Sequence, residues 1–243
     1  MSSTQVSRSL SLFILMLHFT ALSAYQEIVR TFVARDFRPS FFSNEHYQTI
    51  VGSEALRVKV FGFYPRDFQT TRRRINTPDG DFFDVDFTTN VNSAESTPIV
   101  LILHGLESNS QGPLVTKMTS AFLKKGFCCC LVSFRSCSGE ENLTPGAYHL
   151  GFTNDLDHLV RDVINKEFPE KRIYLAGFSL GGNVCLKYLG ELGDLAPQLN
   201  VYGAAVTSVP FDPVASQGKI DSPGFNRMVY SGVSSHCYRN SLN

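Results

Sequence analysis

The residues best suited to chemistry surround Ser179, in the run Gly177-Phe178-Ser179-Leu180-Gly181. This G-x-S-x-G pattern places a serine on a strained turn between a strand and a helix, where its hydroxyl is exposed. The residues before it are apolar, and apolar residues follow with the spacing of one helical face at Leu180, Val184, Tyr188 and Leu192. The context predicts a nucleophilic serine; a phosphate-binding or merely tight turn is the alternative for a glycine-rich sequence.

A serine hydroxyl is a weak nucleophile until a histidine takes its proton and a carboxylate orients that histidine. The oxyanion that forms during acyl transfer also needs preorganised hydrogen-bond donors. We expect two backbone donors, the N–H of Leu180 and the N–H of Leu106 in the loop after residues 99–103. His104 begins that loop and precedes the serine, so we expect it to hold the loop by hydrogen bonds and not to act as the base.

Strands and helices alternate along the middle of the chain. Apolar runs predict buried strands at 99–103, at 127–134, directly before Ser179 and at 201–209. Between them we expect a helix that begins at Pro113, an amphipathic helix at 152–164 and the helix after Ser179. Alternation of this kind predicts a mostly parallel sheet with helices on both faces.

Finer features of these elements also follow from the pattern. The helix after Pro113 should face the sheet with one stripe, formed by Leu114, Met118, Ala121 and Phe122. Upstream, residues 56–63 and 81–88 alternate apolar and polar residues, as half-buried antiparallel strands do, with a turn at 77–80.

Length and composition exclude several classes of protein. The 243 residues suit one α/β domain, and 22 Lys plus Arg balance 22 Asp plus Glu, so no bulk charge favours a nucleic-acid partner. The cysteines match neither a zinc site nor a disulfide framework, and no metal or cofactor is expected; they are Cys128, Cys129, Cys130, Cys137, Cys185 and Cys237. The three consecutive ones are interpreted as free, buried thiols.

Residues 10–24 form an apolar run behind Arg8. The run is shorter than the ~18–20 residues of a comfortable membrane span and is similar to the apolar core of a signal peptide. Ala21 and Ser23 would permit cleavage, whereas extension to Ile28 would give a signal anchor, and a buried N-terminal helix is a third alternative. We expect membrane targeting, with anchor and cleaved signal both open.

Six segments carry a family resemblance. In chain order they are 43–49 (SNEHYQT), His104-Gly105-Leu106, 134–140 (FRSCSGE), 148–155 (Tyr-His-x-Gly-x-Thr-x-Asp), 177–183 (GFSLGGN) and 208–212 (SVPFD). Together they resemble a family of AB hydrolases that includes N-terminally membrane-anchored lipid esterases and phospholipases, plant embryogenesis-associated proteins, fungal acyl ester enzymes and bacterial relatives. The likeness covers most of residues 35–230.

The resemblance implies an α/β-hydrolase fold that hydrolyses carboxylic esters of acyl lipids through Ser179. It also implies a single-pass membrane anchor near residues 10–25. We therefore predict three parts of the chain: 1–28 as anchor or signal segment, 29–229 as an incomplete α/β-hydrolase domain, and 230–243 as an atypical tail.

The sequence departs from the family after the strand at 201–209. Relatives continue through two further strands, and the acid and histidine of the triad lie on the loops that follow them, in the order Ser, Asp, His. Our prediction is accordingly a sheet without its last two strands. Asp212, Asp221 and His236 follow Ser179 in the right order, but we expect Asp212 to be a turn residue and the tail to hold no base near the serine.

Two hypotheses compete at this point, and a third is weak. The chain is either a serine ester hydrolase of acyl lipids or a non-catalytic product that lacks the triad acid and histidine. A nucleotide-binding module is disfavoured, because the glycines around Ser179 form neither G-x-G-x-x-G nor a motif that ends in G-K-[ST].

Overall fold

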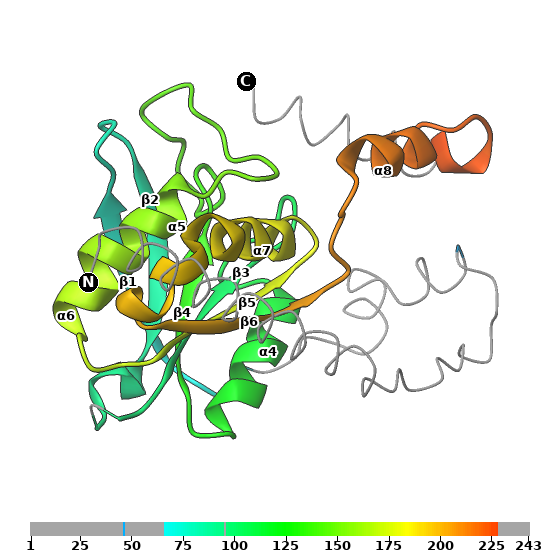
Figure 1. Cartoon of the computed structure of the whole chain (residues 1–243). Coiled ribbons are helices and arrows are strands. Elements are labelled where there is room, and N and C mark those ends of the chain that lie inside the picture. The colour runs from blue at the N-terminus through cyan, green and yellow to red at the C-terminus, as the bar shows by residue number, and fades with distance from the viewer. Residues whose placement is uncertain (1–45, 47–65, 95, 228–243) are drawn as a thin grey trace, which may run out of the picture. The chain divides into compact units, whose positions relative to one another are not determined.

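The structure is a computed structural model that describes residues 46, 66–94 and 96–227 (Figure 1). Its labelled elements belong to one compact unit, Val58–Asn243. The strands are β1 (Thr70–Asn76), β2 (Phe82–Thr88), β3 (Ile99–Leu103), β4 (Cys128–Ser133), β5 (Ile173–Phe178) and β6 (Val201–Thr207). The helical segments are η1 (Thr89–Asn92), α4 (Pro113–Leu123), α5 (Asn154–His158), η2 (Leu159–Ile164, π-helical), α6 (Asn165–Glu167), α7 (Leu180–Leu192), η3 (Gly193–Leu195), η4 (Pro197–Leu199) and α8 (Pro213–Ile220).

The six strands form one mixed sheet in the order β1-β2-β4-β3-β5-β6. β1 pairs with β2, and β2 with β4, in antiparallel fashion, while β4, β3, β5 and β6 run parallel. Leu103 at the end of β3 lies opposite Val132 of β4 and Gly177 of β5. The carboxyl ends of the parallel strands therefore meet at one edge of the sheet, the usual place for a site in this class of fold.

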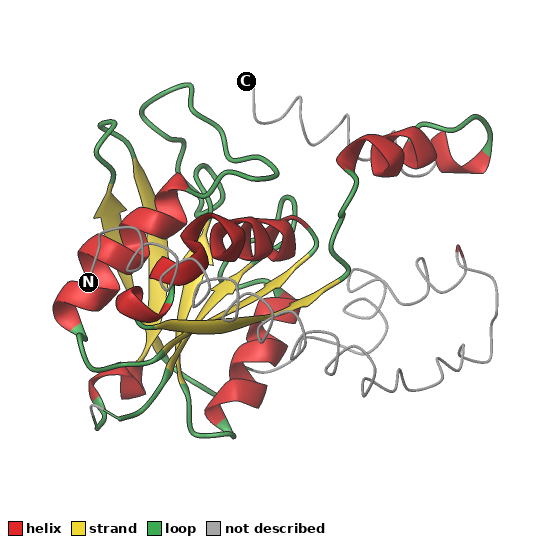
Figure 2. Ribbon diagram, in the orientation of Figure 1, coloured by secondary structure: helices red, strands yellow, loops and turns green. Residues whose placement is uncertain are grey.

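Helices cover both faces of the sheet, as expected (Figure 2). On one face, Val184 of α7 and Leu159 of η2 share a buried apolar cluster with Leu101 of β3. On the other face, Val115 of α4 packs in a second cluster with Val100. Alternate residues of the same buried strand thus enter different clusters, because successive strand side chains point to opposite faces.

The stripe predicted for α4 is only partly right. Met118 and Phe122 pack on the sheet, but Ala121 is exposed and the buried positions include Val115 and Thr119. The hydroxyl of Thr119 donates to the carbonyl of Val115 at 2.8 Å, so a polar residue can be buried on this face without losing its hydrogen bond.

The first strand was not foreseen. The partner of β2 across the turn at 77–80 is β1, whereas the strand expected at 56–63 lies outside the described residues. β1 carries three consecutive arginines, a pattern without apolar alternation. Its register explains them, because Arg72 lies opposite Asp86 and Arg74 opposite Asp84, with Nε–Oδ1 distances of 2.9 and 3.1 Å.

These cross-strand ion pairs also correct the prediction for β2. The strand was expected to be half-buried, yet all its residues are buried, including Asp84 and Asp86. Opposite charges that face each other across a strand pair stabilise the pairing. The arginines of β1 thus cover the acidic face of β2, which would otherwise be exposed to solvent.

The cysteine interpretation is confirmed for the described residues. Cys128, Cys129, Cys130, Cys137 and Cys185 are free thiols, and Cys237 lies outside the described part. Within β4, Cys128 and Cys130 enter one apolar cluster and Cys129 enters the other. They behave as small buried hydrophobic residues.

A buried arginine ties the turn after β1 to the loop after β4. Arg135 is 3 % exposed, and its Nε and Nη2 donate to the two carboxylate oxygens of Asp155 at 2.8 and 2.7 Å. Its Nη1 lies 2.7 Å from Asp79 and 3.5 Å from Asp81. The hydrogen bonds from Arg135 and Thr77 lower the pKa of Asp79 to about 2.

Asp81 completes this network. Burial disfavours its ionised form, but hydrogen bonds from Thr144 and from the amides of Leu143 and Phe82 outweigh that penalty and lower its pKa. Asp155 lies in the first turn of α5, where its negative charge complements the helix dipole. The structure adds a larger role, because the carboxylate is the bidentate partner of Arg135.

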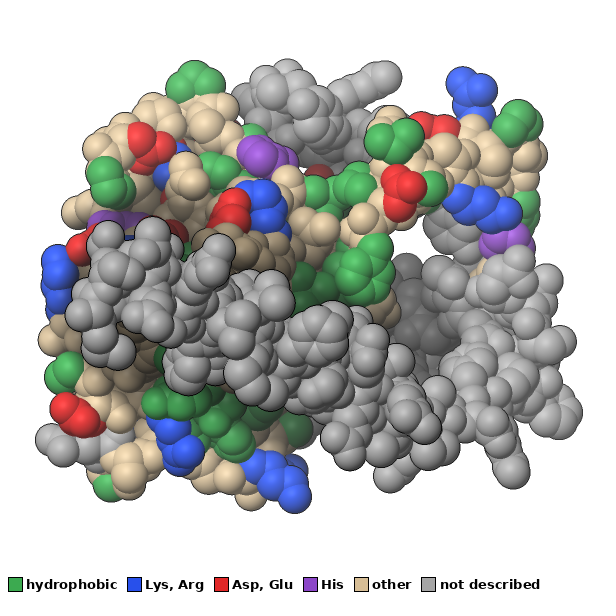
Figure 3. Space-filling view, in the orientation of Figure 1, with side chains coloured by type: hydrophobic (Ala, Val, Ile, Leu, Met, Phe, Trp, Pro, Cys, Tyr) green, Lys and Arg blue, Asp and Glu red, His purple; other side chains and the backbone are tan. Residues whose placement is uncertain are grey.

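The surface agrees with the absence of net charge. On the face shown in Figure 3, acidic and basic side chains of the described residues are interspersed and form no field of one sign. No helix in residues 66–94 and 96–227 is long and apolar enough to cross a bilayer. Residues 10–24 and the predicted domain limits at 28 and 229 lie outside the described residues.

Replacing Arg135 by methionine should destabilise the protein strongly. The change leaves Asp81 and Asp155 buried without their cationic partner, which typically costs about 3–5 kcal/mol. Lys166→Ala is the control, since Lys166 pairs with the exposed Asp162 and such surface pairs contribute little to stability. Urea-induced unfolding measures both free energies, and similar losses for the two variants would contradict the role given to Arg135.

Candidate active site

Ser179 lies on the turn between β5 and α7, at the carboxyl edge of the sheet. Its backbone has φ 53° and ψ −124°, a conformation that residues with a side chain rarely adopt. Hydrogen bonds hold it there: its N–H donates to the carbonyl of Thr207 at 3.0 Å, and its carbonyl accepts from Asn183 at 3.1 Å. The side chain is half-buried. The strained turn described for G-x-S-x-G serines is thus present.

The two glycines that frame Ser179 allow the backbone to cross itself closely. A Cβ atom on Gly177 would lie 2.6 Å from the carbonyl group of Gly181. A Cβ atom on Gly181 would overlap the carbonyl oxygens of Leu103 and His104. Real Cβ atoms do not approach backbone this closely, so only glycine fits at both positions.

The same close packing brings the loop after β3 next to the serine. A Cβ atom built on Gly105 would lie 3.2 Å from the Cβ of Ser179 and 3.0 Å from the ring of Phe178. The structure therefore brings together the three residues predicted for the site, Ser179, Leu180 and Leu106. They come from the ends of β5 and β3 and from the first turn of α7.

The two predicted donors occupy suitable backbone positions. Leu180 is the first residue of α7, and N–H groups in a first helical turn have no partner within the helix. The positive end of the helix dipole also favours negative charge at this point. Within the described residues, the N–H of Leu106 has no hydrogen-bond acceptor.

His104 fixes the direction of the Leu106 N–H. The imidazole is fully buried, its Nε2 accepts from the Phe134 N–H at 3.1 Å, and Nδ1 therefore carries the proton that it donates to the Gly105 carbonyl at 2.6 Å. The C=O of Gly105 and the N–H of Leu106 belong to one trans peptide and point in opposite directions. The Leu106 N–H thus points away from the buried ring.

His104 is not placed to act as a base. Burial lowers its pKa to about 4, although the hydrogen bond to Gly105 opposes the shift. The ring is neutral at pH 7, and both nitrogens are engaged by the backbone. The hydrogen bonds agree with the loop-holding role expected from the sequence.

Sequence reasoning did not single out Tyr148 as part of the site. The N–H of Glu107, the residue after Leu106, donates to the Tyr148 hydroxyl at 3.0 Å. The one available signal was that Tyr148 opens the segment 148–155 of the family resemblance. Tyr148 and Glu107 are 41 residues apart, so no local sequence pattern could indicate their contact.

The structure places the possible triad partners elsewhere or does not describe them. His149 bonds to the carbonyl of Leu150 at 2.7 Å, and His158 bonds to Asp162 and to the carbonyl of Asn76. Neither ring is hydrogen-bonded to Ser179.

The acids after the serine have local roles. Asp212 caps α8 by accepting from the N–H of Ala215 at 2.9 Å, so the residue expected in a turn begins a helix that was not predicted. Asp221 is the C-cap residue of the same helix. His236 lies outside the described residues.

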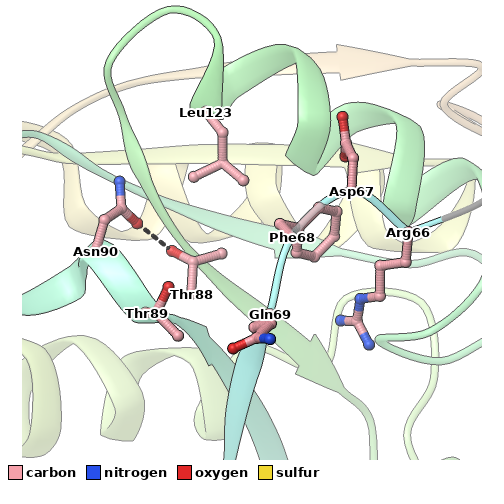
Figure 4. Close-up of a pocket in the computed structure, with 8 residues that line it drawn as sticks. All are labelled: Arg66, Asp67, Phe68, Gln69, Thr88, Thr89, Asn90 and Leu123. Carbon is pink, nitrogen blue, oxygen red and sulfur yellow. Dashed lines mark hydrogen bonds between the residues drawn. The ribbon is translucent and has the colours of Figure 1, made fainter.

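The described residues also form a hollow of about 600 Å³, whose lining is shown in Figure 4. Arg66, Phe68 and Gln69 line it where the chain enters β1, together with Thr88 and Asn90, which are hydrogen-bonded at 2.7 Å, at the end of β2. Thr88 follows Phe87, which pairs with Cys130 in the first half of β4. The hollow is therefore at the amino edge of the parallel strands, opposite the edge that carries Ser179. In residues 66–94 and 96–227, no group of acidic, His or Cys side chains is arranged to hold a metal ion.

Comparison with known families and proteins gives a consistent result. A family model described as the alpha/beta hydrolase fold matches residues 98–232. A putative esterase, YheT, from Escherichia coli is 32% identical over 187 residues, which cover 77% of this chain and 52% of that protein. The human phospholipase ABHD3 is 30% identical over 174 residues, 70% of this chain and 41% of its own length. A monoacylglycerol lipase from Saccharomyces cerevisiae is 33% identical over 147 residues, 60% and 32% of the two chains.

The chain spans about half the length, or less, of the curated relatives it matches. Among solved structures, the esterase Pf2001 of Pyrococcus furiosus superposes with a TM-score of 0.53 at 22% identity, over 74% of this chain and 66% of that one. The α/β-hydrolase fold expected from the sequence is thereby confirmed, with six strands in the described residues.

Two glycines of α7 provide a direct test of the close backbone contact between the start of α7 and the end of β3. Gly181→Ala should destabilise the protein by about 3 kcal/mol, because the new methyl group meets the backbone of Leu103 and His104. Gly190→Ala, in the same helix and in open space, should stabilise it by about 0.5–1 kcal/mol through helix propensity. Chemical unfolding measures the free energy of unfolding of both variants. A Gly181→Ala protein as stable as Gly190→Ala would contradict the close contact of Gly181 with the backbone of Leu103 and His104.

Proposed function

The chain belongs to the alpha/beta hydrolase fold family, and from that premise we propose that it is a serine hydrolase of carboxylic esters. Ser179 is the nucleophile in this proposal, and the N–H groups of Leu106 and Leu180 form the oxyanion hole. One observation carries it: a serine with φ 53° directly precedes α7 as its N-cap and lies against Gly105 in the loop of residues 104–108. That arrangement is the one that acyl transfer to a serine requires.

In the proposed reaction, Oγ of Ser179 attacks the ester carbonyl carbon and its proton passes to a histidine base. The carbonyl oxygen becomes an oxyanion that accepts hydrogen bonds from the Leu106 and Leu180 amides. The bond to the alcohol oxygen then breaks, and the alcohol leaves with the proton. Water, deprotonated by the same base, releases the acyl group as a carboxylic acid and restores the serine.

The relatives support esters of acyl chains as the substrate class. Three of its relatives are described as a putative esterase, a monoacylglycerol lipase and a phospholipase. All three descriptions share cleavage of an ester. We propose an acyl lipid or acyl ester as the substrate of this chain on that basis.

A second candidate is a chain that keeps the serine site without turning over esters. One observation favours it: in residues 66–94 and 96–227, the rings of His104, His149 and His158 bond to other groups, and none of them serves Ser179. A nucleophilic serine needs such a base for activation. The two candidates differ in whether Ser179 is chemically reactive.

Reactivity of Ser179 separates these candidates. We expect a fluorophosphonate probe to label the folded full chain on one residue, because the probe reacts with serines activated for acyl transfer. Ser179→Ala should abolish labelling, whereas Ser120→Ala, at a half-buried position of α4, should label like the wild type. Mass spectrometry of the intact protein and its peptides reads the result. A wild-type chain that is folded but unlabelled would favour the second candidate.

We further propose that residues 10–24 attach the chain to a membrane. The support is in the sequence, where this apolar run follows Arg8 at the N-terminus. The proposed substrates agree with it, since acyl lipids are concentrated in membranes.

Membrane attachment predicts that the full chain, expressed in cells, stays with the membrane pellet after alkaline carbonate extraction. Leu15→Arg should release most of it, because an arginine in the middle of an apolar span costs about 2.5–3.5 kcal/mol. Ser11→Arg, beside the basic flank, should leave it in the pellet. A soluble product of reduced mass would identify a cleaved signal, and a soluble product of full mass would contradict membrane targeting.

A further inference from the structure

Tyr148 makes a contact that bears directly on the loop after β3. Its hydroxyl accepts the N–H of Glu107 at 3.0 Å. Glu107 has φ 54°, a left-handed conformation that is unfavourable for a residue with a side chain and persists only where neighbouring groups enforce it. The hydroxyl of Tyr148 is one such group.

The tyrosine ring is itself held firmly. It stacks on Phe134 with a centroid distance of 5.1 Å and an interplanar angle of 3°, and it lies edge-on to His104 at 6.3 Å. Burial, and after it the neighbouring thiol of Cys137, raise the pKa of the Tyr148 hydroxyl, which therefore stays protonated at neutral pH. The loop after β4 therefore provides a fixed base for a contact with the loop after β3.

These contacts constrain the Leu106 residue from both sides. The Gly105 carbonyl, in the peptide before Leu106, is held by His104 and also accepts weakly from Ser108 at 3.4 Å. The Glu107 N–H, in the peptide after Leu106, is held by Tyr148. With both flanking peptides fixed, the Leu106 amide cannot rotate without breaking a hydrogen bond.

We propose that Tyr148 is a positioning residue that holds the 104–108 loop so that the Leu106 N–H faces the oxyanion formed at Ser179. This inference rests on the proposed function, and it adds to it a residue outside the nucleophile turn and the loop itself. Tyr148 does not touch the reacting atoms. It acts through Glu107, by keeping a strained backbone in its productive conformation before substrate arrives.

The proposal requires the hydroxyl, not only the ring. Tyr148→Phe removes one oxygen and keeps the stacking on Phe134, so the variant should fold and retain its thermal midpoint. Tyr202→Phe is a matched control, because Tyr202 is 55% exposed on β6 and is not part of these contacts. Loss of a whole oxyanion donor typically costs ~10²–10³ in rate, and misalignment of one donor should cost roughly tenfold.

Two measurements on the full chain test this. We expect the rate of fluorophosphonate labelling at Ser179 and kcat for a short-chain nitrophenyl ester to fall about tenfold in Tyr148→Phe with KM unchanged, and neither to change in Tyr202→Phe. Amide hydrogen exchange of residues 104–108 should accelerate in Tyr148→Phe alone. A variant that labels at the wild-type rate would overturn the proposal.

Amide hydrogen exchange tests the positioning role of Tyr148 separately from the proposed hydrolase function. If the wild-type chain is not labelled at all, the proposed function fails, but faster exchange at Glu107 in Tyr148→Phe would still show that the tyrosine holds the loop. Unchanged exchange at Glu107 would overturn the positioning role whatever the activity of the chain. A large fall in thermal midpoint with unchanged labelling per folded molecule would assign Tyr148 to stability and likewise overturn it.

Discussion

The crossing of the β5–α7 turn over the end of β3 is the constraint on which the site depends. Backbone atoms of Gly177 and Gly181 approach each other, and Gly181 lies on the carbonyls of Leu103 and His104, at distances that exclude a side chain. This contact places α7 over the sheet with its N-terminus at the carboxyl edge. It also brings the loop after β3 beside Ser179, so the nucleophile and both proposed donors take their positions from one packing contact.

Much of this could be predicted from the sequence, because the signals were local. The strands at β3, β4 and β5 are continuous apolar runs, and the stripe of α7 from Leu180 to Leu192 is buried as its spacing indicated. The G-x-S-x-G motif predicts a tight turn because its two glycines have no side chain and allow backbone segments to approach closely. The features that sequence reasoning missed depend on partners distant in the chain. β1 is recognisable only when its arginines are set against the acids of β2, and the burial of Asp84 is explained only by its ion pair with Arg74.

Buried charge has a particular place in this fold. The ion pairs of Arg72, Arg74 and Arg135 all lie where antiparallel β1 and β2, or the turn between them, meet the loops that follow β4. The parallel part of the sheet is apolar on both faces and needs no such pairs. Specific hydrogen-bonded pairs fix one arrangement among many, whereas apolar contacts tolerate small shifts. The ion pairs therefore set the position of the loop after β4, and through Phe134 that loop supports His104 and Tyr148.

Backbone strain is gathered at the same edge of the sheet. In the described residues, each of the four parallel strands is followed within a few residues by a non-glycine with positive φ: Glu107 after β3, Ser136 after β4, Ser179 after β5 and Ser208 after β6. Such conformations persist where surrounding contacts enforce them, and they are concentrated at functional sites. Here Glu107 is held by Tyr148, Ser136 by Asn142, and Ser179 by Thr207. The strained residues come from separate strands and their supports from other segments, so the geometry around Ser179 is a property of the assembled edge. The G-x-S-x-G motif is enough to identify the serine from the sequence. The alignment of the proposed oxyanion donors depends instead on contacts between loops that only the fold brings together.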